Sequence, residues 1–211
     1  MNWALNNLEL VLQLTLTHLL VSLIPLAIGF VIAVLLARVT SNRFAPAITG
    51  SLGALYAIPS LALFVTLPVL IGTNFVGPTN VLIALTIYVV SAMFFSARDA
   101  FAALPKPTIE FAQAQGLSAT QRFFYVELPL ATPGLIAGAR VAAASTISMA
   151  SIGAVVGVRN LGYLFLDGFQ RKINDEILTG LIAIFLIAIA IDLGLWLLGK
   201  ALTPWQRGVN V

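Results

Sequence analysis

Five long apolar segments dominate this sequence, and they restrict the fold more than any other feature. Each has about 20 mostly apolar residues, the length that an α-helix needs to cross the hydrocarbon layer of a membrane. A backbone in lipid must satisfy its own hydrogen bonds, and a helix does so within one segment. We expect spans at about residues 17–38, 48–71, 80–104, 133–157 and 177–200. The sequence therefore predicts an all-α integral membrane protein with about five transmembrane helices.

The composition supports this interpretation. Only 9% of the residues are charged, against about 25% in soluble domains. We expect one membrane domain, 1–211, because several spans leave no room for a soluble domain. There is no cysteine, and we find no P-loop, no metal-ligand spacing and no nucleophile–base pair. We therefore expect no enzyme, no cofactor and no metal in this chain, and no nucleic-acid partner.

The distribution of cations predicts the orientation in the membrane. Eight Lys and Arg residues lie on one side if the polar segment after the third span is cytoplasmic: Arg38, Arg43, Arg98, Lys106, Arg122, Arg140, Lys200 and Arg207. The other three, Arg159, Arg171 and Lys172, fall outside. Because positive residues concentrate on the inner side, we expect the N-terminus outside and the C-terminus in the cytoplasm.

Residues 105–129 form the longest stretch that is neither apolar nor a short turn. Glu110 is expected in the first turn of a short helix, where the helix dipole favours a carboxylate. Gly116 is expected to end that helix in the left-handed conformation. Ser118 and Gln121 have the spacing of a capping box that opens a second helix. Pro129 is expected to begin a new element, and the whole stretch is a candidate docking platform.

The same stretch resembles the EAA loop of bacterial ABC importer permeases. That motif reads Glu-Ala-Ala, three residues, Gly, nine residues, an aliphatic residue, any residue, then Leu-Pro. Phe111 is the departure, since the family usually has alanine there. We assign the ATPase-coupling loop to Glu110, Phe111, Ala112, Gly116, Leu117, Val126, Leu128 and Pro129.

The resemblance implies a fold, a location and partners. The fold is that of a type I ABC importer permease, in a bacterial inner membrane, with a cytoplasmic coupling helix. Each coupling loop inserts into one of two ATP-binding subunits, which carry the ATP and Mg. A second permease, identical or paralogous, completes the pathway within the lipid. An extracytoplasmic substrate-binding protein delivers the solute.

Shorter segments narrow the family. His18-Leu19-Leu20, residues 57–63 (AIPSLAL) and Asn160-Leu161-Gly162 resemble the osmoprotectant branch, whose members import glycine betaine, choline or carnitine. Two alternatives stay open. One is the permease of a methionine or other amino-acid importer, which shares the EAA loop. The other is a channel or membrane scaffold whose loop docks a partner that is not an ATPase.

The fourth span is rich in Gly, Ala, Ser and Thr, residues that let helices approach closely. It is therefore expected at the centre, lining a pathway or packing on a second copy. The candidate pathway residues are Ser145, Thr146, Ser148, Met149 and Ser151. The alternative is tight packing, with the hydroxyls bonded to their own backbone.

Two charged residues are expected within the bilayer, Arg140 in the fourth span and Asp192 in the fifth. The two spans run in opposite directions, so the residues reach a similar depth. An isolated charge there is costly. We therefore expect Arg140 and Asp192 to pair as a structural clamp or to share an inner aqueous cavity.

Two further features are interpreted more loosely. His18 is expected to be a satisfied histidine at the membrane interface rather than a proton-coupling one. Residues 158–176 alternate apolar and charged groups outside the membrane. They are expected to form a cap over the pathway or a landing surface for an extracytoplasmic partner.

Overall fold

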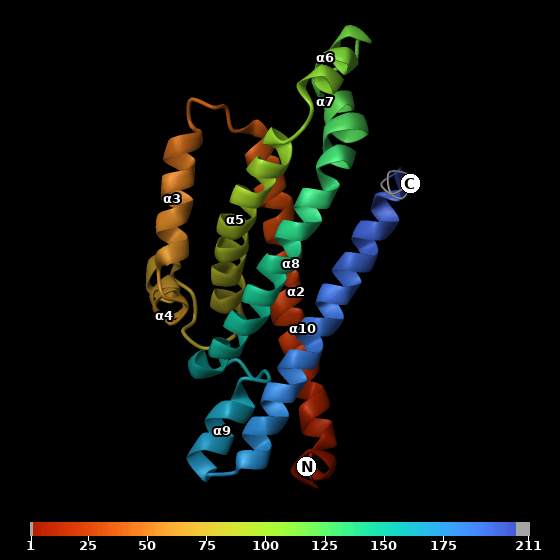
Figure 1. Ribbon diagram of the computed structural model, residues 1–211. Helices are drawn as coiled ribbons and strands as arrows, with labels where there is room; N and C mark the ends of the chain where they lie inside the picture. Colours follow the sequence, from red (N-terminus) through yellow and green to blue (C-terminus); the bar gives the residue numbers. More distant parts are fainter. Residues whose placement is uncertain (1, 206–211) are drawn as a thin grey trace.

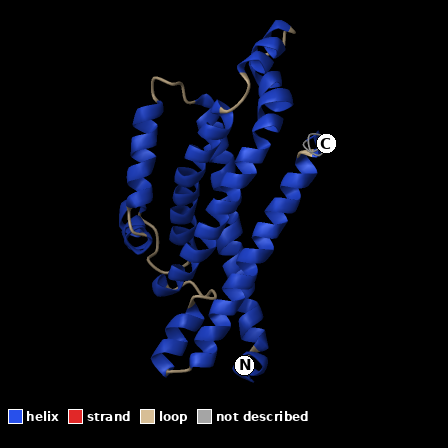
Figure 2. Ribbon diagram, viewed as in Figure 1, coloured by secondary structure: helices blue, strands red, loops and turns tan. Residues whose placement is uncertain are grey.

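The computed structural model describes residues 2–205, and within them all regular structure is helical (Figures 1 and 2). The helices are α1 (Asn2–Asn6), α2 (Leu8–Val39), α3 (Ala45–Ala57), α4 (Ser60–Ile71), α5 (Pro78–Ala102), α6 (Lys106–Ala114), α7 (Ala119–Arg122), η1 (Phe123–Glu127, π-helical), α8 (Leu128–Ile152), η2 (Gly153–Val156, 3₁₀), α9 (Tyr163–Arg171) and α10 (Asn174–Leu202). Arg207, assigned to the inner side, lies outside the described residues.

In the described part of the chain, four helical segments are long and apolar enough to cross a membrane. They are α2, α5, the continuous segment Ala119–Val156 and α10. The bent pair α3–α4 makes a fifth if it counts as one span. Helix α2 begins at Leu8 rather than near residue 17, because the apolar residues ahead of the expected span continue the helix.

Helices α2, α5 and α8 pack together as the centre of the bundle (Figure 1). Glycines permit the close approach. A Cβ added at Gly138 would lie 2.5 Å from the Cβ of Ser96, and one at Gly134 would lie 2.8 Å from the Cβ of Ala100. Ala142, on the same stripe, is 2% exposed. The small residues of α8 therefore bring it against α5 within one chain.

Residues 48–71, expected as one straight span, belong instead to two helices that meet at 105°. The cause is Pro59, which lacks an N–H and forces the residue before it out of the helical conformation. Ile58 is accordingly extended, with ψ 132°. Its carbonyl, free of a helical partner, accepts a hydrogen bond from the Tyr88 hydroxyl of α5. The break is thus held in place by the neighbouring helix.

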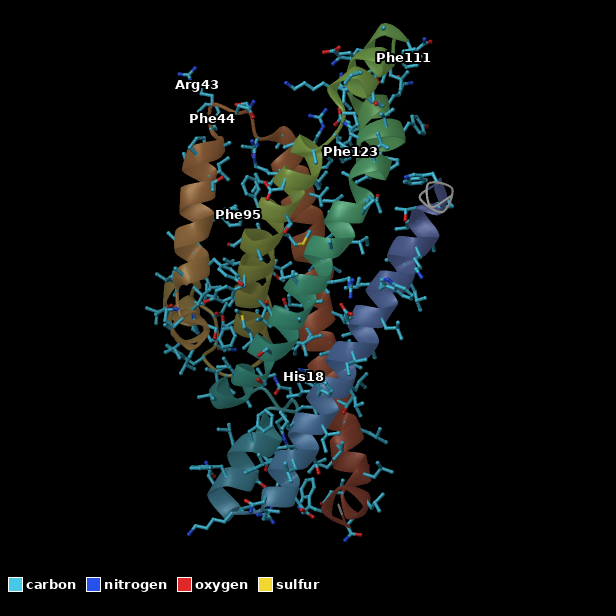
Figure 3. All side chains as sticks on the ribbon, viewed as in Figure 1. His18, Arg43, Phe44, Phe95, Phe111 and Phe123 are labelled. Atoms are coloured by element: carbon cyan, nitrogen blue, oxygen red, sulfur yellow. The ribbon has the colours of Figure 1, made fainter. Side chains whose placement is uncertain are left out.

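A buried polar cluster joins α2 to the end of α8 that lies far from the coupling loop. His18 and Asn160 are both 0% exposed, and Figure 3 shows His18 deep in the bundle. His18 Nε2 donates to the Ile147 carbonyl at 3.1 Å. Asn160 Nδ2 donates to the Ala150 carbonyl at 2.7 Å, and its Oδ1 accepts from the Gly162 N–H at 2.8 Å. His18 is therefore buried between helices and bonded to the backbone of α8, not placed at the membrane interface as expected.

Helix α10 packs on α8 and α9, and one ion pair connects it to α8. Arg140 Nε and Nη2 donate to the two carboxylate oxygens of Asp192 at 2.6 and 2.7 Å. This two-bond geometry is the strong form of the interaction. In the single chain the two side chains remain 38% and 47% exposed. The structure therefore brings the residues together but leaves one side of the pair uncovered.

The turn that follows η2 tolerates no side chain at Gly162. A Cβ there would lie 1.9 Å from the Ser151 carbonyl oxygen. We expect Gly162→Ala to destabilise the protein by about 1–3 kcal/mol, the usual effect of overpacking. Gly50→Ala is the matched control, because its Cβ meets nothing within 4 Å. Equal thermal unfolding midpoints for the two purified variants would contradict the prediction.

The Arg140–Asp192 pair makes a separate prediction about stability. Asp192→Leu alone leaves an unpaired guanidinium at membrane depth. We expect it to lower the thermal unfolding midpoint in lipid nanodiscs more than the double change Arg140→Met, Asp192→Leu does. If the effects of Arg140→Met and Asp192→Leu on the unfolding midpoint simply add in the double variant, the pair does not contribute as a unit.

Candidate functional site

The candidate site is the helical projection formed by α6 and α7, which extends beyond the bundle (Figure 1). Gly116 turns the chain between the two helices with φ +80°, in the left-handed region. Ser118 Oγ then accepts from the Gln121 N–H at 3.3 Å, and Gln121 Oε1 accepts from the Ser118 N–H at 2.9 Å. The predicted capping box is confirmed. Local hydrogen bonds therefore fix this corner.

One local prediction about this segment is wrong. Helix α6 begins at Lys106, so Glu110 lies in its second turn and the first turn has no acidic residue. The reason is Pro107, which is well accommodated at the start of a helix, where its missing N–H is not needed. The prediction for Pro129 is confirmed, since α8 begins at Leu128 with this proline in its first turn. The helical segment is nevertheless continuous, because η1 leads directly into α8.

Large aromatic side chains are exposed on the projection and at its base. Phe111 on α6 is 66% exposed, and Figure 3 places it near the far end of the projection. Phe124 and Tyr125 in η1, at the base, are 56% and 75% exposed. Ala112 is 5% exposed and faces inward. Apolar side chains gathered on a projection are typical of an interaction surface.

The eight assigned coupling-loop residues differ in exposure. Glu110, Phe111 and Gly116 are exposed, Ala112 is buried, and Leu117, Val126, Leu128 and Pro129 are half-buried. The exposed residues lie on α6 and its corner. The half-buried ones lie mostly where α7 continues into α8. The segment therefore has an outer face for contact and a base that packs on the bundle.

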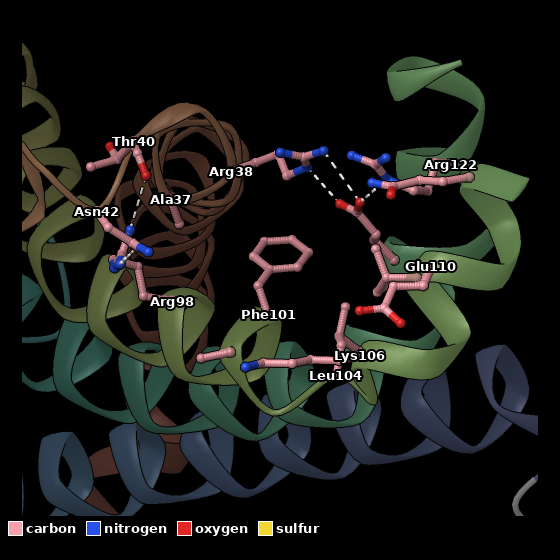
Figure 4. A pocket seen from close by; sticks show the side chains of 14 residues that line it. Ala37, Arg38, Thr40, Asn42, Arg98, Phe101, Leu104, Lys106, Glu110 and Arg122 are labelled. Atoms are coloured by element: carbon pink, nitrogen blue, oxygen red, sulfur yellow. Dashed lines mark hydrogen bonds and ion pairs between the residues drawn. The ribbon is translucent and has the colours of Figure 1, made fainter. Parts of the chain in front are cut away.

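Glu127, a carboxylate in the polar segment 105–129, is buried. Its side chain is only 7% exposed, although nothing in the local sequence distinguishes it from a surface charge. Its Oε1 accepts from Arg122 Nε at 2.7 Å, and its Oε2 lies 2.5 Å from Arg38 Nε. Figure 4 shows the Arg38 and Arg122 side chains pointing toward one another, with their ion pairs drawn as dashed lines. Arg38 is 89 positions away in the sequence, so no local pattern connects the two.

The ion cluster borders a cavity of about 530 Å³ between the projection and the ends of α2 and α5. Its charged lining residues are Arg38, Arg98, Lys106, Arg122, Glu110 and Glu127. Arg98 donates across its rim to the Thr40 carbonyl at 3.1 Å and to Asn42 Oδ1 at 3.2 Å. The excess of cations makes this end of the bundle electropositive.

The candidate pathway residues of α8 do not converge on one cavity. Thr146 is buried and donates to the Ala142 carbonyl at 2.7 Å, while Ser151 donates to the Ser148 carbonyl at 2.6 Å. Ser148 is itself exposed. Ser145 and Met149 border a crevice with α3 and α5 that is too narrow for a water molecule. The hydroxyls of Thr146 and Ser151 are thus bonded to the backbone of their own helix, as the alternative of tight packing predicts.

Helix α9 lies at the end opposite the projection and is amphipathic. Leu164 and Gly168 are buried against the bundle, whereas Phe169 is 78% exposed. Arg171 Nη1 donates to Asp167 Oδ2 at 2.8 Å, and this bond holds the pKa of the Asp167 carboxyl below its usual range. Among residues 2–205, no group of three or more His, Asp or Glu side chains is placed to hold a metal ion.

Comparisons with known proteins agree with this architecture. The osmoprotectant import permease protein OsmW of Salmonella typhimurium is 31% identical over 210 residues, which are 96% of each chain. The glycine betaine/carnitine/choline permease protein OpuCB of Bacillus subtilis is 28% identical over 89% of this chain and 86% of its own length. A chain of the inward-facing MetNI methionine ABC transporter superposes with a TM-score of 0.83.

That structural match covers 94% of this chain and 98% of the other at 21% identity, so it shows the fold alone. The family model of the binding-protein-dependent transport system inner membrane component matches residues 13–208. The chain therefore belongs to this family of inner-membrane transport components.

Proposed function

We propose that this chain is the membrane subunit of an ATP-driven importer for a quaternary ammonium osmoprotectant such as glycine betaine, choline or carnitine. The observation that carries the proposal is the 31% identity to an osmoprotectant import permease over 96% of both chains. Relatives from Bacillus subtilis and Listeria monocytogenes have names that include choline, glycine betaine and carnitine. The alternative of an amino-acid importer has weaker support, because the chain resembles the methionine transporter in fold alone.

The projection of α6 and α7 couples this subunit to a separate ATPase. Two ATP-binding subunits hold the ATP and Mg, and each receives one projection. The exposed Phe111 supplies an apolar contact and Glu110 a charged one. Because α7 continues through η1 into α8, a displacement of the tip moves the central helix of the bundle. This continuity supports a lever rather than a flexible tether.

The projection faces the cytoplasm, with the N-terminus outside and the C-terminus inside. Arg38, Arg98, Lys106 and Arg122 all border the cavity at the projection end, where the positive-inside rule places cations. The first helix begins at the opposite end of the bundle, and α10 ends on the side of the projection (Figure 1). The extracytoplasmic binding protein then approaches the end that carries α9.

A second permease, identical or paralogous, covers the open side of α8 and α10. Val141 is 68% exposed on α8, and Ala144 and Ser148 continue the same exposed face. The uncovered Arg140–Asp192 pair lies on these two helices as well. Lipid solvates such a pair poorly, so a protein partner or an aqueous pathway is the favoured neighbour.

The solute class is tested in proteoliposomes that contain this chain, its ATPase subunit and its binding protein. We expect glycine betaine, choline or carnitine to stimulate ATP hydrolysis by about fivefold or more, as coupled sites do. Methionine and taurine serve as comparison solutes. Stimulation by methionine alone would instead indicate an amino-acid importer. An ion current without nucleotide would indicate a channel.

The coupling assignment is tested by Glu110→Arg and Gly116→Pro. The first reverses an exposed charge, and the second cannot adopt φ +80° because proline holds φ near −65°. We expect each to reduce uptake by about tenfold, as the loss of an interface anchor does, with the thermal unfolding midpoint unchanged. Glu9→Arg, an exposed reversal at the far end of α2, is the control. Normal uptake by both loop variants would refute the assignment.

A further inference from the structure

We propose that Glu127 is the positioning residue that transmits movement of the coupling loop to α2, in addition to α8. The inference rests on the proposed function, because it concerns the path of the same force. Glu127 occupies the last position of η1, directly ahead of α8. Arg38 lies in the last turn of α2, and Arg122 ends α7. One carboxylate therefore joins three helical segments.

The charges make this joint, the contact of Glu127 with Arg38 and Arg122, depend on Glu127 in particular. Two guanidiniums share one buried carboxylate, with N–O separations of 2.5 Å to Arg38 and 2.7 Å to Arg122. Without the negative charge, the two cations would face each other across a partly buried space and repel. Removing either arginine leaves the carboxylate one partner, whereas removing Glu127 leaves both arginines without this partner.

Elsewhere the projection is only loosely attached. The cavity of about 530 Å³ separates α6 from the ends of α2 and α5, and α6 packs mainly on α7 and η1. The base of the projection, formed by η1, makes the contact with α2 and α5. Phe123 in η1 is 8% exposed, and its ring lies under the Arg38 guanidinium at 5.9 Å and beside the Phe101 ring of α5 at 6.1 Å. An aromatic contact thus supports the ionic one.

The joint also completes a second connection between α2 and α8. At the far end of the bundle, His18 of α2 bonds the Ile147 carbonyl of α8. At the projection end, Arg38 of α2 bonds Glu127 at the base of α8. Two helices tied at both ends move as one body. We therefore expect a displacement of the loop to carry α2 along with α8.

The variant Glu127→Gln keeps the shape of the side chain and removes its charge. Its matched control is Glu9→Gln, which removes an exposed carboxylate at the far end of α2, away from the projection. Both are purified with the ATPase subunits, and solute imported per ATP hydrolysed is measured in proteoliposomes. We expect Glu127→Gln to retain the ATPase subunits and lose about tenfold in that ratio. Adding Arg38→Met to Glu127→Gln should change the ratio little further, because the two act as a unit.

A distance measurement separates coupling from simple stability. The chain contains no cysteine, so spin labels attach only where cysteines are introduced. We place them at Val39, beside Arg38, and at Gln113 on α6, both exposed. With Glu127 present, we expect one narrow distance distribution that is retained on ATP binding. Glu127→Gln should broaden it, and Glu9→Gln should not.

Each result decides one question. A wild-type import ratio together with a narrow distribution in Glu127→Gln overturns the inference. If that variant fails to fold, Arg38→Gln replaces it, and a normal ratio in Arg38→Gln overturns the inference equally. Failure of the unaltered chain to associate with the ATPase subunits would refute the proposed function instead, so the two failures are distinguishable.

Discussion

One continuous helical segment, residues 119–156, passes from the projecting loop into the centre of the bundle, and the rest of the structure depends on how it packs. Its glycines at 134 and 138 bring it into close contact with Ala100 and Ser96 of α5. In a membrane there is little hydrophobic drive between helices, so this close van der Waals contact is a principal source of association. The π-helical turn η1 leads directly into α8, so the segment runs on without a break.

Polar groups then determine how the other helices attach to this segment. Four polar contacts with α8 are specific: His18 and Asn160 bond to its backbone, Arg140 pairs with Asp192, and Glu127 holds Arg38. Such bonds restrict geometry more than apolar contacts do, because they are directional. Helices α2 and α10 are thereby held at particular points along α8. Helices α3 and α4, which meet at a proline break, pack on α5 instead.

The single chain also has an incomplete surface, which agrees with membership of a family of transport components. The outer face of α8 and the ion pair with α10 are half-covered, and three aromatic rings are exposed on the projection and at its base. A stable monomer seldom exposes such features in combination.

The sequence by itself determined the helical membrane class, the Gly116 corner and the capping box at Ser118, because hydropathy, turn chemistry and capping are local properties. Other features depended on distant residues. The sequence shows the proline at position 59, but the bend there is held by the hydrogen bond from the Tyr88 hydroxyl of α5 to the Ile58 carbonyl. Glu127 looked like Glu110 in the sequence, and only the approach of Arg38 distinguishes them. Only the tertiary structure decided which of these two carboxylates is buried, since burial is set by residues far away in the chain.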